Sequence, residues 1–154
     1  SFKGDYSSVG IIKKDSLIPI KYFQSWKTKK KDVEVKIFFE KYKIKELLIN
    51  PVEKESARID YKGLFGYSDP LTSFISILQK NEPSYTTDGR RVYLLFPNKN
   101  EKSTKILIKE YKNIWADHKR NKLEFIEVFN KTENLFPKKI QIGFDGMLFV
   151  LTKN

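Results

Sequence analysis

The sequence predicts a mainly β protein, at the margin of the α+β class, whose strands form an antiparallel meander. We expect this meander to make an open or partial β-barrel, or a curved sheet, with one helix on its concave side. Short segments of alternating apolar and polar residues follow one another, and only one stretch has a helical period. Twelve Phe and eight Tyr stand against one Met, a balance that favours strands. Parallel strands would need more crossover helices than this sequence supplies.

Size and composition fit a single β-rich domain over residues 1–154. A chain of this length buries roughly two thirds of the surface that its unfolded form exposes, and a hydrophobic content of 40% supplies a core. The absence of Cys excludes disulfides, thiolate chemistry and Cys-ligated metals. No apolar run reaches the ~18 residues that a membrane-spanning helix needs.

Three strands are predicted in the first quarter of the chain. Ser7–Ile12 is a short strand interrupted by Gly10, and a polar turn follows it. Ile18–Thr28 begins with Pro19, whose missing N–H costs little at a strand start. Val33–Phe39 alternates most regularly, so we expect one of its faces to be buried and the strand to pair with the one before it.

The next segments are less regular. Tyr42–Ile49 fits either a strand or a helical turn, because its apolar residues match both periods, and Pro51 ends it in either case. Ser56–Tyr61 is predicted as a strand, and Gly63–Gly66 as a flexible approach to the helix.

The predicted helix covers residues 69–80. Asp69 is expected to cap it, and Pro70 suits its first position, where a missing N–H is no loss. An apolar stripe at positions i, i+3, i+4 and i+7 predicts the buried face: Leu71, Phe74, Ile75 and Leu78. A helix this short is only marginally stable by itself, and we therefore expect a sheet to cover this stripe.

The second half predicts a run of hairpins. Asp88-Gly89 is typical of a two-residue type I′ turn between strands at Tyr85–Thr87 and Arg90–Phe96. Four further strands follow: Thr104–Trp115, Leu123–Phe129, Ile140–Phe144 and Met147–Thr152.

Reactive side chains form no recognisable catalytic pattern, so we predict no catalytic residue, no metal ligand and no cofactor. The one imidazole, His118, lies in a polar loop and is expected to face solvent. Asp88 and Asp145 each precede a Gly and are explained as turn residues. Of Arg90 and Arg91, which could clamp an anion, we expect one on the solvent face and the other over a barrel rim.

Four apolar side chains are candidates for lining a ligand cavity between the sheet and the helix: Trp26, Phe74, Leu78 and Trp115. The alternative is that the aromatic residues simply pack on the helix as core. A formal charge of +11 would attract nucleic acid or acidic partners, but the lysines are scattered over alternate strand positions and no recognition motif is present.

Three patterns resemble a bacterial family catalogued only as a domain of unknown function, number three-one-zero-eight. They are Ser8-Val9-Gly10-Ile11 followed by Leu17-Ile18-Pro19, then Asp69-Pro70-Leu71-Thr72-Ser73, and then Leu135-Phe136-Pro137. The resemblance implies an exported protein of Gram-negative bacteria, in the periplasm or cell envelope, with the signal peptide absent from this chain. It also implies further strands ahead of Ser1, and it carries no catalytic residues.

These observations lead to a functional hypothesis of a non-enzymatic periplasmic or envelope binding domain. Its curved sheet would hold an apolar ligand, such as a lipid or peptide, or dock on an envelope protein. One alternative is a structural subunit of a large cell-envelope assembly. The other is a basic nucleic-acid-binding domain, although we expect no specific nucleic acid as partner.

Overall fold

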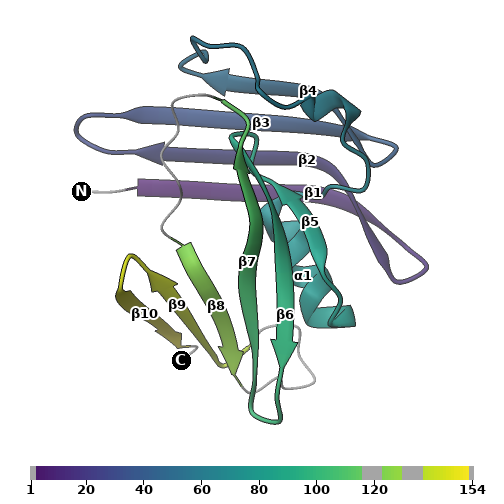
Figure 1. Cartoon of the computed structure of the whole chain (residues 1–154), viewed down its shortest axis with the longest axis vertical. Helices are drawn as coiled ribbons and strands as arrows, with labels where there is room; N and C mark the ends of the chain where they lie inside the picture. Colours follow the sequence, from purple (N-terminus) through teal and green to yellow (C-terminus); the bar gives the residue numbers. More distant parts are fainter. Residues whose placement is uncertain (1–2, 116–122, 130–136, 153–154) are drawn as a thin grey trace.

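The computed structural model describes residues 3–115, 123–129 and 137–152, which form ten strands in two antiparallel sheets (Figure 1). Sheet 1 is a meander of four strands: β1 (Lys3–Lys13), β2 (Ser16–Lys27), β3 (Asp32–Glu40) and β4 (Lys43–Asn50). Sheet 2 is a meander of six: β5 (Ser84–Thr87), β6 (Arg91–Lys99), β7 (Ser103–Asn113), β8 (Leu123–Phe129), β9 (Lys139–Phe144) and β10 (Met147–Thr152). The segment between the sheets holds a 3-10 helix, η1 (Tyr61–Gly63), and the helix α1 (Pro70–Lys80).

The predicted fold class is confirmed. The described residues are mostly strand, every strand pair is antiparallel, and α1 is the α-helix that the sequence predicts. Within the described ranges the strands form no closed barrel, and the meander divides into two sheets after β4. Strands of sheet 1 run across the view in Figure 1, whereas β6 and β7 run down it. No described helix is long and apolar enough to cross a membrane.

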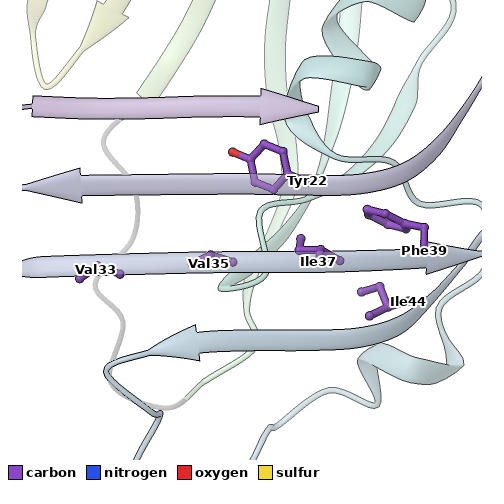
Figure 2. Packing of buried hydrophobic residues seen from close by; sticks show 6 residues of the cluster. All are labelled: Tyr22, Val33, Val35, Ile37, Phe39 and Ile44. Carbon is purple, nitrogen blue, oxygen red and sulfur yellow. The ribbon is translucent and has the colours of Figure 1, made fainter. Parts of the chain in front are cut away.

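The core of sheet 1 follows from the alternation in β3. Val33, Val35, Ile37 and Phe39 are all buried, and the residues between them are more exposed. Figure 2 shows these side chains along β3, with Tyr22 from β2 and Ile44 from β4 beside them. Sheet 2 has its own core cluster, which α1 joins: Ile77, Leu95 and Ile106.

Helix α1 begins as the sequence predicts. The Asp69 carboxylate accepts hydrogen bonds from the backbone N–H groups of Leu71 and Thr72, both at 3.0 Å, and Pro70 is the first helical residue. Asp69 is fully buried, and its other oxygen accepts from the hydroxyls of Thr72 at 2.6 Å and Ser8 at 2.9 Å. The cap therefore also ties the helix to β1.

The buried face of α1 differs from the predicted stripe. Ile75 is 37% exposed, whereas the buried positions are Thr72, Ser73, Ile77 and Leu78. The helix contacts β1 and β2 on one side and β5 and β6 on the other, so two sheets cover it instead of one. The Ser73 Oγ accepts hydrogen bonds from Thr86 Oγ1 at 2.8 Å and from Ser84 Oγ at 3.0 Å, which explains how a polar residue fits on that face.

The structure decides the two predictions for the segments from Tyr42 to Tyr61. Tyr42–Ile49 is a strand, since β4 pairs with β3 along its length. The predicted strand Ser56–Tyr61 is wrong: this segment is irregular and leads into η1, capped by Asp60. Its backbone bonds to the residue after β7 and not to a neighbouring strand: the N–H of Arg58 donates to the carbonyl of Ile114 at 2.7 Å. His118 lies outside the described residues.

Candidate functional site

The two sheets meet where the β5–β6 hairpin tip reaches sheet 1 (Figure 1). The N–H of Asp88 donates to the carbonyl of Arg91 at 3.3 Å, so Gly89 and Arg90 form the tip. The predicted Asp88-Gly89 turn is therefore displaced by one residue. The cause is the Asp88 side chain, whose Oδ1 accepts from the N–H groups of Arg90 at 2.9 Å and Arg91 at 2.8 Å.

Gly89 allows the tip to press against the core of sheet 1. Its φ is +82°, a conformation that favours glycine. A Cβ added here would lie 2.7 Å from Val35 Cγ1 and 2.8 Å from Leu47 Cδ1. The tip thus packs on the buried face of β3 and β4 without space for a side chain.

Trp115 holds the tip from the other side. Its indole N–H donates to the carbonyl of Gly89 at 3.1 Å, and its ring lies 5.8 Å from that of Tyr61. The preceding residue, Ile114, is fully buried, and its N–H donates to the carbonyl of Arg90 at 3.0 Å. The end of β7, the segment around Arg58 and the hairpin tip therefore form one hydrogen-bonded unit over sheet 1.

Arg90 at the tip and Arg91, the first residue of β6, are both held in ion pairs. Arg90 is only 8% exposed, with its Nε 3.7 Å from Glu53 Oε1, and Arg91 Nη1 lies 3.1 Å from Asp88 Oδ2. The prediction of one arginine on the solvent face is wrong, because packing against sheet 1 removes the tip from water. Burial and the neighbouring Arg91 lower the pKa of Arg90, while Glu53 opposes this shift. Burial also disfavours the charge on Arg91, but its interactions with Asp88 and Tyr111 together outweigh burial and raise the pKa of Arg91.

Tyrosines surround these charges and stay neutral. Burial raises the pKa of Tyr93 well above its usual range, and the Asp88 carboxylate adds to the shift. Burial raises the pKa of Tyr22 in the same way, and its hydroxyl donates to Gln24 Oε1 at 3.0 Å. The contacts of this cluster pair most of its buried polar atoms, although Arg91 Nε is buried without a hydrogen-bond partner among the described residues.

Beside the ion pairs lies a cavity of about 210 Å³, between the ends of β3 and β4, the segment 51–55 and Trp115. Its lining is mainly apolar, with charged side chains among it: Lys31, Val33, Ile49, Pro51, Val52, Glu53, Lys54, Glu55, Arg90 and Trp115. Val33 and the core beneath it form the floor, whereas Val52 is 81% exposed at the rim. The cavity is therefore an apolar hollow with a charged rim, open to solvent beside residue 52.

The four predicted cavity residues separate into two places. Trp115 lines the cavity, and Trp26 packs on the same core cluster with Lys31 Nζ 5.5 Å from its ring centre. Phe74 and Leu78 lie on α1, where Phe74 packs on the cluster of sheet 2. The structure thus gathers the two tryptophans around the core of sheet 1 and leaves the two helix residues apart from them.

Sequence reasoning missed the charged part of the site. Glu53 and the segment 51–55 had no assigned role, although Pro51 after a strand is a signal for an irregular connection. The described residues contain no group of three His, Asp or Glu placed to bind a metal. A second hollow, of about 490 Å³ near the β6–β7 turn, is lined by polar side chains apart from Phe129.

Comparison with protein-family models, with curated proteins and with solved structures finds no match to this chain.

Proposed function

We propose that the protein is a non-enzymatic binding domain of the bacterial cell envelope, which takes one apolar side chain of a partner protein into the cavity beside Trp115. The volume of this cavity carries the proposal. About 210 Å³ is below the roughly 300 to 1,000 Å³ of sites that enclose a whole small molecule. A single leucine or phenylalanine side chain matches it better than a lipid, so docking on a protein is favoured over carrying an apolar ligand.

Charge indicates which kind of segment would present that side chain. The cavity lining carries three cations, Lys31, Lys54 and Arg90, against two carboxylates, Glu53 and Glu55, and the chain as a whole has a formal charge of +11. A partner segment with acidic residues beside its apolar anchor would be drawn to this surface and oriented on it. Burial of one such anchor contributes about 1.5 to 3 kcal/mol.

The two other hypotheses have less support. Lysines that lie over aromatic rings come from both sheets: Lys21, Lys36, Lys105, Lys109 and Lys139. This spread does not favour a nucleic-acid interface, which needs cations gathered on one face. A structural subunit of an envelope assembly would also use a docking cavity, so that role remains compatible with the proposal.

The location in the periplasm or envelope rests on the family resemblance. Fractionation of cells that make the complete protein tests it: we expect the protein in the periplasmic or envelope fraction, and recovery in the cytosolic fraction alone would refute it.

A peptide titration tests the binding proposal. The chain has two Trp, so in a Trp26→Phe background the fluorescence reports Trp115. The probe is an acidic hexapeptide with one central leucine, and the comparison peptide has serine in its place. We expect the serine peptide to bind about 10- to 150-fold more weakly, the equivalent of one buried leucine.

Two matched variants control for the site of binding. Val52→Phe enlarges a side chain at the cavity rim, and Ile12→Phe makes the same kind of change at a position of similar exposure, 81% against 75%. Only Val52→Phe should weaken the binding of the leucine peptide. Equal affinity for both peptides would refute the proposal, and so would saturation of the Trp115 signal by oleate but not by peptide.

A further inference from the structure

The outermost described strand of sheet 2, β10, exposes an apolar run along an edge that no other described strand pairs with. Among the described strands it pairs with β9 only. Its residues Met147–Leu151 are all apolar and each is between 49% and 56% exposed. Successive side chains point to opposite faces, so both faces of the strand are apolar. Unpaired backbone N–H and C=O groups beside such side chains are a template for another strand.

The other outer strands are protected against such pairing. β1 carries three charged residues, and its register shifts between Val9 and Gly10. The outer side of β5 bonds to Ser68, whose N–H donates to Tyr85 and whose carbonyl accepts from Thr87. β4 carries three charged residues in its first half, and Phe65 forms a β-bridge with its first residue, Lys43. By contrast, β10 has no charge, no proline and an uninterrupted register.

Charges at the two ends of β10 indicate which strand fits. Near Met147 lie Asp145 and Glu124, whose Oε1 accepts from the Gly146 N–H at 3.2 Å. Near Thr152 lies the exposed Lys138, because it precedes Lys139, the β9 partner of Thr152; the Lys139 ammonium itself lies over the Phe129 ring of β8. One end of the edge is therefore acidic and the other basic. A strand from the same protein, running antiparallel, would place each acidic end against a basic end.

We propose that β10 pairs antiparallel with β10 of a second copy of this chain, across a twofold axis at Phe149. This register puts Phe149 opposite its own counterpart, Met147 opposite Leu151 of the second copy, and Leu148 opposite Val150 of the second copy. Residues on the same face of each sheet then meet, as a continuous antiparallel sheet requires. The contact is isologous, so it closes as a dimer and leaves no open β10 edge for further growth.

The dimer is independent of the proposed binding function, because it uses the β10 edge of sheet 2, and no β10 residue lines the cavity. Sedimentation equilibrium with the purified protein should give a dimer. Phe149→Lys places two like charges opposite each other at the axis and should give a monomer. The matched change Ile12→Lys, on the edge strand β1, should leave the dimer intact, as should Val52→Phe.

Disulfide trapping tests the register without relying on a destabilising change. The chain has no Cys, so Phe149→Cys adds the only thiol. Directly opposite residues of antiparallel strands have Cα atoms about 4.5 or 5.5 Å apart, within the range of a disulfide. Mild oxidation should therefore link Phe149→Cys into a covalent dimer and leave Ile12→Cys as a monomer. The proposal is overturned if the protein is monomeric at its solubility limit, if Phe149→Lys remains a dimer, or if both Cys variants cross-link equally.

Discussion

Replacement of Gly89 by Ala tests whether the β5–β6 tip is wedged against sheet 1. The backbone at Gly89 has φ +82°, where a residue with a Cβ costs about 1 to 2 kcal/mol. The new methyl would also meet Val35 Cγ1 at 2.7 Å and Leu47 Cδ1 at 2.8 Å. Overpacking of this kind costs about 1 to 3 kcal/mol. We expect Gly89→Ala to lower the free energy of unfolding by about 2 to 5 kcal/mol.

Gly146→Ala separates the two contributions. Gly146 has a similar φ, +73°, but nothing lies within 4 Å of a Cβ added there. Gly146→Ala should therefore lower the free energy of unfolding by the backbone contribution alone, about 1 to 2 kcal/mol. Urea unfolding of both variants should show Gly89→Ala to be less stable by about 1 to 3 kcal/mol, or roughly 2 to 12 °C in Tm. Equal losses would show that the tip is not packed on β3 and β4, and would refute the reasoning on which the site is built.

Three further predictions concern buried polar groups. Asp69→Ala removes the helix cap and leaves two hydroxyls without their acceptor, so thermal unfolding should show a loss of about 2 to 4 kcal/mol; Asp69→Asn, which keeps the cap, should lose less. The raised pKa of Tyr93 means that the folded state keeps its proton where the unfolded state loses it, so stability should hold below about pH 10 and fall above it. Urea midpoints at alkaline pH should fall less steeply for Tyr93→Phe than for the exposed control Tyr85→Phe; identical slopes would contradict this. Asp88→Asn should cost about 3 to 5 kcal/mol because it leaves the Arg91 guanidinium buried without its counter-charge, and the double change with Arg91→Met should recover part of that loss. Additive losses in this cycle would argue against the ion pair.

The sequence predicts strands best where one face alone is buried. The alternation of Val33 to Phe39 predicts β3 and its buried face, because one side of that strand covers the core. The cap at Asp69 and Pro70 was equally visible, since it depends on neighbours within one turn. Ile75 shows where prediction from helical periodicity fails. The periodic pattern assumes that one side of a helix is covered, whereas α1 lies between two sheets and buries Thr72 and Ser73 while Ile75 is exposed.

The candidate site was predictable only in part, because it is assembled from segments far apart in the sequence. Trp115 was selected for its size and does line the cavity. Of Arg90 and Arg91, one was expected on the solvent face and the other over a barrel rim, whereas Arg90 is only 8% exposed. The burial of Arg90 depends on the packing of the tip against sheet 1, which no local pattern encodes. Glu53 lies in the irregular segment after β4, and only the fold brings it to Arg90.

Photo-crosslinking in cells from the cavity rim tests the central claim most directly. A photoreactive residue in place of Val52 should capture one partner protein, and mass spectrometry should place the linked site at an apolar residue flanked by acidic ones. The same residue in place of Ile12 should not capture that segment. Adducts of Val52 with lipid alone, or the same protein fragments from both positions, would contradict a docking cavity at the junction of the two sheets.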